Sequence, residues 1–395
     1  MTSGTAAFPV PAPTRATDAT LPASASDWGA RFSEFMLVGG ATLLLFPLSW
    51  LLRRTFGLTA PEYAVGFATF YGAYVINDPH FAVTYLLFYK DVRKRTLSAS
   101  YDGVHRVRYA VAGFVVPAAL AAWAMVAIAS RSAPMLGGMI ELMFFLVGWH
   151  YVKQGFGVVT VLSARRGVRI TRRERSVILF HCFAGWAYAW ASPAAAAGEF
   201  EEKGVVYRGL LHPRWLEVTA GGALAASTAA LVAVLIARWR RERKMLPWAP
   251  FLGFLVTVWS WTIFSSADRL IQYLIPALHS IQYFYFVWLM KRNEARAEEG
   301  PPSFGRPVTV RLGFLAVSAL GLGWLLFRGA PTFLDGLYAP RATRGSLPDA
   351  LGATPFFAAF FVIVNIHHYF MDHVVWRRDN PDTRYLREPG ASPSM

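Results

Sequence analysis

The histidines of this chain are the residues whose type and spacing point most directly to chemistry. There are nine in 395 residues, and most of them fall inside long apolar stretches instead of polar loops. Imidazole nitrogen binds Fe, Zn, Cu and Ni well, and ionisable groups in an apolar setting are costly and usually functional. The candidate metal ligands are His80, His150, His279, His367 and His368.

Polar companions accompany these histidines at helical spacing. Residues three or four apart lie on one helix face, so each such pair can act on a common site. The pairs are His150–Gln154, His279–Gln282, Asn365–His368 and His368–Asp372. We expect Asp372 to bind metal too, and the other companions to orient the imidazole rings. These orienting residues are Asn77, Gln154, Gln282, Asn365, Tyr283, Tyr369 and His373.

Two carboxylates, Asp78 and Asp372, are the candidate catalytic groups, because they could balance the charge of a metal ion and move protons. Asp78 and His80 are only two residues apart and would diverge on a regular helix. Pro79 disfavours helical geometry at the residue before it. We therefore predict a local break at this point that turns both side chains inward.

The composition indicates a membrane protein. Apolar residues make up 55% of the chain, charged residues 16%, and the mean hydropathy is +0.35, whereas a soluble domain is roughly 25% charged. The single cysteine, Cys182, excludes a disulfide scaffold. A net charge of +15 is also typical of nucleic-acid binding, but here the basic residues lie between apolar runs. No nucleic-acid partner is expected.

Ten apolar stretches are long enough to cross the roughly 30 Å of a bilayer core as helices. The run Gly221–Ala237 does not alternate as the strands of a membrane barrel do, so the predicted fold is an all-α, polytopic bundle of about 10 transmembrane helices. The predicted spans cover residues 33–52, 62–89, 107–129, 135–163, 176–196, 215–237, 247–265, 270–290, 309–328 and 351–376.

The positions of Lys and Arg predict the orientation of these spans. Basic clusters follow every even-numbered span, and short basic loops stay on the cytoplasmic side. Both termini are then cytoplasmic, and Arg53 and Arg54 are the exception, since they fall outside. We expect a multi-pass protein of a bacterial inner membrane, with a disordered tail at 1–27, one helical domain at 28–378 and a flexible tail at 379–395.

The buried histidines lie at similar distances from the cytoplasmic ends of their predicted spans, which supports a common site. His80, His150, His279 and His368 each lie about 9–15 residues before the basic cluster that follows their span, which is roughly 14–22 Å along a helix. Spans two, four, eight and ten could therefore bring them into one layer in the cytoplasmic half of the bilayer. The alternative is that each histidine makes a separate hydrogen bond between helices.

These four histidine-bearing spans, with the pair His367-His368 and the nearby His373, resemble the histidine-rich integral-membrane iron oxygenases. That group includes fatty-acid desaturases, lipid hydroxylases and the bacterial carotene-cleaving proteins of the Brp/Blh type. The resemblance implies O₂-dependent oxidation, in lipid metabolism, of a lipid or other apolar substrate that arrives laterally from the bilayer. It also implies one or two iron ions and, for some reactions, a redox partner.

Two other functions remain open from the sequence. Two of the histidines on facing helices could hold haem for electron transfer. Alternatively, Asp78, Asp372 and the histidines could form a path for ions, protons or lipids. The residues outward of His150, His279 and Asn365 are mostly apolar, which favours a closed site and therefore an enzyme, a membrane oxidoreductase, over a transporter.

Overall fold

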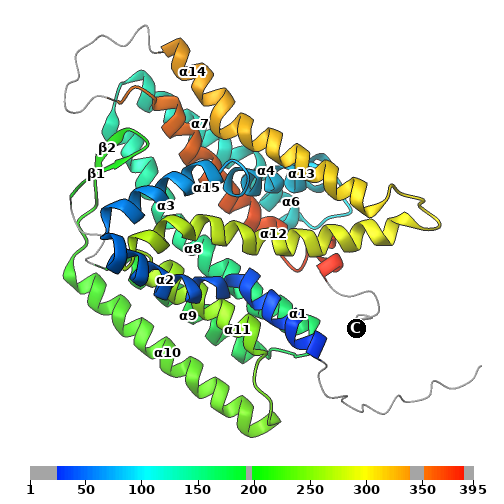
Figure 1. The fold of residues 1–395 in the computed structure, drawn as a ribbon. Coiled ribbons are helices and arrows are strands. Elements are labelled where there is room, and N and C mark those ends of the chain that lie inside the picture. Colours follow the sequence, from blue (N-terminus) through cyan, green and yellow to red (C-terminus); the bar gives the residue numbers. More distant parts are fainter. Residues whose placement is uncertain (1–24, 193–197, 339–350, 387–395) are drawn as a thin grey trace, which may run out of the picture.

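The computed structural model describes residues 25–192, 198–338 and 351–386, and these form a bundle of helices (Figure 1). The strands of the described part are β1 (Glu199–Glu202) and β2 (Val205–Arg208), a short antiparallel hairpin in which Glu199 pairs with Arg208. Apart from this hairpin, which the sequence did not predict, the elements of the described residues are helices. The all-α prediction is confirmed at this level.

Among the described residues, six helical segments are long and apolar enough to span a membrane, which indicates a multi-pass membrane protein. The first segment combines α1 (Ala25–Phe35), η1 (Met36–Gly40) and α2 (Ala41–Phe56), and the second combines α6 (Gly103–Ala110), η2 (Val111–Val115) and α7 (Val116–Ala129). The third and fourth are α8 (Ala133–Arg165) and α10 (Arg214–Glu242). The fifth combines α13 (Val308–Trp324), η5 (Leu325–Gly329) and α14 (Ala330–Tyr338), and the sixth is α15 (Pro355–Val375).

The other predicted spans fall on helices that are shorter or more polar. They are α3 (Thr59–Gly72) with α4 (Asn77–Tyr89), α9 (Arg172–Ala191), α11 (Trp248–Leu255) with η4 (Val256–Ile263), and α12 (Arg269–Glu299). The count of ten spans and the cytoplasmic termini therefore stay predictions. The remaining elements are α5 (Val92–Leu97) and η7 (Pro381–Leu386).

The predicted break near Asp78 is present, but it lies earlier in the chain. The helix is interrupted between Gly72 and Asn77, and α4 then runs through Asp78, Pro79 and His80. A proline is tolerated in the first turn of a helix, because the N–H group that it lacks would have no partner there. The break separates the two halves of the segment, and α4 is the buried half, with nine of its thirteen residues buried.

Helix α15 is the central helix of the bundle. Its most apolar stretch is 72% buried, whereas the corresponding stretches of the other five membrane-length helices are between 17% and 44% buried. It packs against α4, α7 and α8, while α10 and the pair α13–α14 lie along opposite sides of the bundle in Figure 1. Among these six segments, α15 therefore gives its polar side chains the most protection from lipid and water.

Four π-helical segments, η1, η2, η4 and η5, interrupt the described helices. A π-turn shifts the backbone register and frees carbonyl groups for other donors, and such turns are common at functional sites. In η1, Gly39 has φ 127°, a conformation that L side chains rarely adopt, and the carbonyl of Val38 accepts a hydrogen bond from Gln282. In η2, the carbonyls of Ala112 and Gly113 accept hydrogen bonds from other helices.

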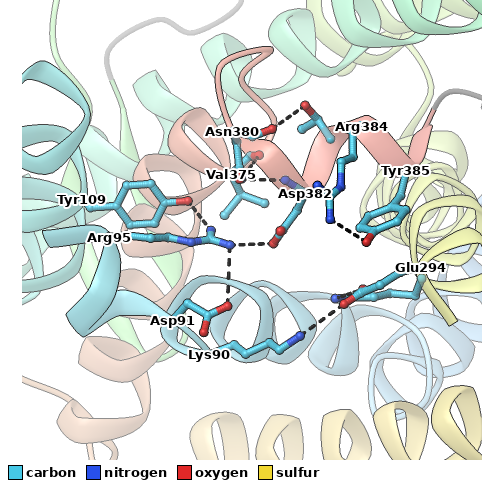
Figure 2. Close-up of polar contacts among 12 residues, drawn as sticks. Lys90, Asp91, Arg95, Tyr109, Glu294, Val375, Asn380, Asp382, Arg384 and Tyr385 are labelled. Atoms are coloured by element: carbon cyan, nitrogen blue, oxygen red, sulfur yellow. Dashed lines mark hydrogen bonds and ion pairs between the residues drawn. The ribbon is translucent and has the colours of Figure 1, made fainter. Parts of the chain in front are cut away.

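The chain after α15 is packed against the end of the bundle as far as residue 386. Figure 2 shows the guanidinium of Arg95 between the hydroxyl of Tyr109 and the carboxylates of Asp91 and Asp382, with 2.6 Å to Asp382. Leu386 is buried. Residues 379–386, which the sequence analysis assigned to a flexible tail, are thus packed against the bundle, where η7 supplies the anionic partner that the buried arginine needs. The division into domains stays a prediction. Residues 1–24 and 387–395 lie outside the described residues, and α1 begins at Ala25.

The orientation can be tested with single cysteines introduced at exposed serines in a Cys182→Ala background. We expect cysteines at Ser130 and Ser266 to react with a membrane-impermeant maleimide in intact cells. Cysteines at Ser100 and Ser303 should react only after the cells are made permeable, because they follow even-numbered predicted spans. Labelling of position 303 in intact cells would contradict a membrane-spanning α12, since it would place both ends of that helix outside.

Candidate metal centre

Four helices bring one histidine each to a single point in the buried interior. The residues are His80 on α4, His150 on α8, His279 on α12 and His368 on α15. One ring nitrogen of each lies within 4.8 Å of those of the others. All four side chains are buried, and none is more than 5% exposed. The four histidines are therefore close enough to hold a metal ion.

The rings meet edge to face instead of stacking. The ring centroids of His80 and His368 are 4.5 Å apart, and those of His150 and His279 are 4.8 Å apart, at steep interplanar angles. The Nε2 atoms of His150 and His279 are 3.1 Å apart. The rings are thus packed around the point where one nitrogen of each comes within 4.8 Å of the others.

The nitrogen atoms of the cluster are largely without hydrogen-bond partners. Both ring nitrogens of His80 and of His368, and Nδ1 of His279, are buried and make no hydrogen bond within the described part of the chain. A buried polar group without a partner costs about 1–3 kcal/mol, and histidines that merely joined helices would be expected to use these atoms. Neutral imidazole nitrogens are good donors to transition metals, so the residues present fit a metal ion.

One carboxylate oxygen of Asp372 faces the cluster, and the other is held by hydrogen bonds from neighbouring residues. Its Oδ2 lies 3.4 Å from Nε2 of His368 and 3.9 Å from Nε2 of His150. Its Oδ1 accepts hydrogen bonds of 3.2 Å from the hydroxyls of Thr84 and Tyr283 and from the indole of Trp376. Three donors on one oxygen fix the orientation of the carboxylate, with Oδ2 directed at the histidines.

Two hydrogen-bonded amide side chains, Gln154 and Gln282, hold the backbone at His279 in place. The Nε2 group of Gln154 donates to the backbone carbonyl of His279 at 3.2 Å and to Oε1 of Gln282 at 2.7 Å. Gln282 in turn donates to the carbonyl of Val38 in η1 and to the hydroxyl of Thr257 in η4. Three elements, α8, η1 and η4, are thereby tied to α12, which carries one candidate ligand.

Tyrosines and asparagines complete the surroundings of the cluster. The ring of Tyr369 stacks on His150 at 4.7 Å, and its hydroxyl donates to Oδ1 of Asn365 at 3.1 Å. The ring of Tyr283 lies 4.6 Å from that of His80. Asn77 accepts a hydrogen bond from Ser280, the neighbour of His279. Most of the predicted orienting residues thus contact the ligands or their immediate neighbours. Gln282 instead acts through Gln154, and His373 is described next.

Three predicted site residues lie elsewhere. His367 faces away from the cluster, with Nδ1 2.9 Å from the hydroxyl of Tyr85 and Nε2 3.0 Å from the carbonyl of Ala112, because consecutive residues on a helix diverge by about 100°. Asp78 lies against Arg328, 3.9 Å away. The ring of His373 packs on that of Trp149 at 5.2 Å. The sequence left His367 and His368 as alternative ligands, and the structure brings His368 into the cluster.

Two residues that hold the site were not predicted. Thr84 is four residues after His80, and Trp376 is four residues after Asp372. Both therefore lie on the same helix face as a predicted site residue, and this spacing could have identified them. The contact of Thr84 with Asp372 joins α4 to α15, and that of Trp376 lies within the last turn of α15.

Comparison of this chain with known protein families, with curated proteins and with solved structures found no match. The assignment of the site therefore depends on its geometry.

Metal binding should stabilise the protein through His368 and not through its neighbour. A ligand at 100 times its Kd adds about 2.7 kcal/mol, so we expect Fe²⁺ or Co²⁺ to raise the unfolding temperature of metal-free protein in detergent by a few degrees. His368→Gln should abolish this increase. The matched control, His367→Gln, should lower the starting temperature but keep the increase. Equal responses of the two variants would contradict the site.

Proposed function

We propose that the chain is an integral-membrane, metal-dependent oxidoreductase or oxygenase that acts on a lipid or another hydrophobic substrate. The observation that carries the proposal is the convergence of four buried imidazoles from four helices, with one nitrogen of each within 4.8 Å of the others and five ring nitrogens of His80, His279 and His368 unpartnered among the described residues. We infer that the metal is non-haem iron, held by His80, His150, His279 and His368. Asp372 completes this set as an anionic group at the edge of the site.

The donor set supports this choice of metal. Imidazole with carboxylate suits Fe²⁺, and the absence of thiolate ligands from the cluster removes the donors that favour Cu⁺ or structural Zn²⁺. When bound, iron would supply the ability to activate dioxygen. The chain supplies the rest: Thr84, Tyr283 and Trp376 hold Asp372 in place. One negative charge beside four neutral ligands partly balances a divalent ion, and its Oδ2 can accept or release a proton.

The packing of the rings disfavours haem. A porphyrin held between two axial histidines needs an open plane between their rings. Here the centroids of all four rings lie about 4.5–5.0 Å from their neighbours in the cluster, so the rings of the other two histidines occupy that plane. A single metal ion fits between such rings, whereas a macrocycle does not.

The surroundings of the cluster favour an apolar substrate over a transported ion. On one side the cluster is closed by Phe81, whose ring lies 4.8 Å from that of His368, and by Phe327 and Val364, which are also buried. An ion path would require polar groups within this layer, which is apolar. The bundle also exposes many large apolar side chains, so a substrate dissolved in the bilayer could approach from its side. A cytoplasmic redox partner and a bacterial inner membrane belong to the same proposal.

The reaction class can be tested on wild-type protein purified with its metal. We expect stoichiometric iron without the Soret band of haem. In membrane vesicles under ¹⁸O₂ with a reductant, we expect lipid products that form only in the presence of oxygen, and mass spectrometry will distinguish oxygen insertion from dehydrogenation. His80→Asn should remove the products and lower metal affinity at least 10–100-fold.

The matched control is His181→Asn. His181 is also a buried intramembrane histidine, but its Nδ1 lies 3.1 Å from the hydroxyl of Ser227, outside the cluster. This variant should keep both metal and products. Wild-type protein without a stoichiometric transition metal, under conditions that retain bound metal, would contradict the proposal, as would full activity of His80→Asn.

A further inference from the structure

Arg328 is a charged residue inside a membrane-length helical segment, Val308–Tyr338. It lies in the π-helical segment η5, and its side chain is 17% exposed. An arginine at this depth costs several kcal/mol on insertion scales, so a chain keeps one only where it has a partner or a use. The proposed metal centre does not use it.

Aromatic rings and one carboxylate surround this guanidinium. Its central carbon lies 4.6 Å from the ring centroid of Phe70, 4.4 Å from that of Tyr74 and 5.5 Å from that of Phe357. Its Nε lies 3.9 Å from Oδ2 of Asp78. The site is partly open toward the outside of the bundle, because the ring of Phe70 is 46% exposed. We call these five residues the Arg328 site.

The two charged groups at this site do not satisfy one another. The separation of 3.9 Å between Nε of Arg328 and Oδ2 of Asp78 is too long for a hydrogen bond. Neither atom has any hydrogen-bond partner among the described residues, although Asp78 is only 3% exposed. A buried donor and a buried acceptor are thus left facing each other. A single oxygen that both accepts and donates could bridge them at the usual lengths of about 2.7–3.0 Å.

The Arg328 site is one layer of rings away from the histidine cluster. Phe327 precedes Arg328, and its ring lies 5.1 Å from that of Phe81, which in turn contacts the ring of His368. Asp78 is on the same helix as His80, two residues earlier. The backbone of α13 approaches closely here, because a Cβ on Gly323 would lie 2.7 Å from the carbonyl carbon of Asp78. A molecule held by Arg328 would lie across the rings of Phe81 and Phe327 from His368, and its apolar part would have to pass these rings to reach the cluster.

We propose that the Arg328 site binds the hydroxyl group of a long, otherwise apolar molecule. The site carries one positive and one negative charge, so a neutral group adds no unbalanced charge inside the membrane. A hydroxyl can accept from Arg328 and donate to Asp78, which a carboxylate or a hydrocarbon cannot do. The aromatic rings pack against the adjoining chain. This inference rests on the proposed function in taking that molecule to be a substrate of the metal centre.

Photo-labelling of full-length protein in detergent tests the site without requiring metal or turnover. The probe is 1-hexadecanol with a diazirine near its hydroxyl end. We expect it to label peptides that contain Phe70, Tyr74 or Phe357. Unlabelled 1-hexadecanol should compete at a concentration roughly tenfold lower than hexadecane or palmitate, since an unmet hydrogen bond of this kind is worth about a factor of ten.

The variant Arg328→Met should label roughly tenfold less and lose the preference for the alcohol over the hydrocarbon. The matched control is Arg53→Met, which removes another arginine paired with an aspartate, Asp268, away from the Arg328 site. This control should keep the preference. Unfolding temperature and elution profile identify a variant that has not folded, and the comparison of competitors in the wild type does not depend on any variant.

Equal competition by hexadecanol and hexadecane in the wild type would overturn the inference, because it would mean simple partition into an apolar surface. Stronger competition by palmitate would overturn it too, since the ligand would then be an anion. Retention of the alcohol preference in Arg328→Met would have the same consequence. These results are separate from those for the metal centre: protein that contains iron but shows no preference for the alcohol refutes only this inference, and an alcohol preference without metal refutes only the proposed function.

Discussion

The main constraint on this structure is that buried polar atoms need a hydrogen-bond or metal partner, because an apolar medium offers them none. Five ring nitrogens of the histidine cluster have no hydrogen-bond partner in the described chain, and each would cost about 1–3 kcal/mol if left that way. A fold does not collect such atoms at one point for stability, because apolar side chains would pack there at lower cost. A metal ion accepts one nitrogen from each ring, so it would remove this cost for up to three of the five atoms together.

The rest of the fold can be understood as the support for this arrangement. Asp372 is held by donors from α4, α12 and α15, and His279 is braced by amides that reach the backbone of η1. Two π-helical segments contribute directly to this network, through the carbonyl of Val38 and the hydroxyl of Thr257. A third presents Arg328 to Asp78. Departures from regular helix thus occur where a buried polar group needs a partner.

The sequence predicted the helical class and the membrane setting, because length and apolar composition are local properties. It also predicted that His80, His150, His279 and His368 would meet, since their depths relative to the basic loops are similar. It could not decide between His367 and His368, because both have the same depth and only the rotation of α15 separates them. It missed Arg328 as a partner of Asp78, because that contact joins helices far apart in the chain. The ordered segment around Asp382 was missed for the same reason.

X-ray absorption at the metal edge of iron-loaded wild-type protein tests the central claim most directly. Four coordinated imidazoles predict a first shell of nitrogen and oxygen at roughly 2.0–2.2 Å. They also predict the outer-shell scattering that rigid imidazole rings produce, fitted by about four rings per iron. A spectrum that needs no more than one imidazole, or one of iron surrounded by water oxygens alone, would contradict the account and leave the four histidines as helix contacts.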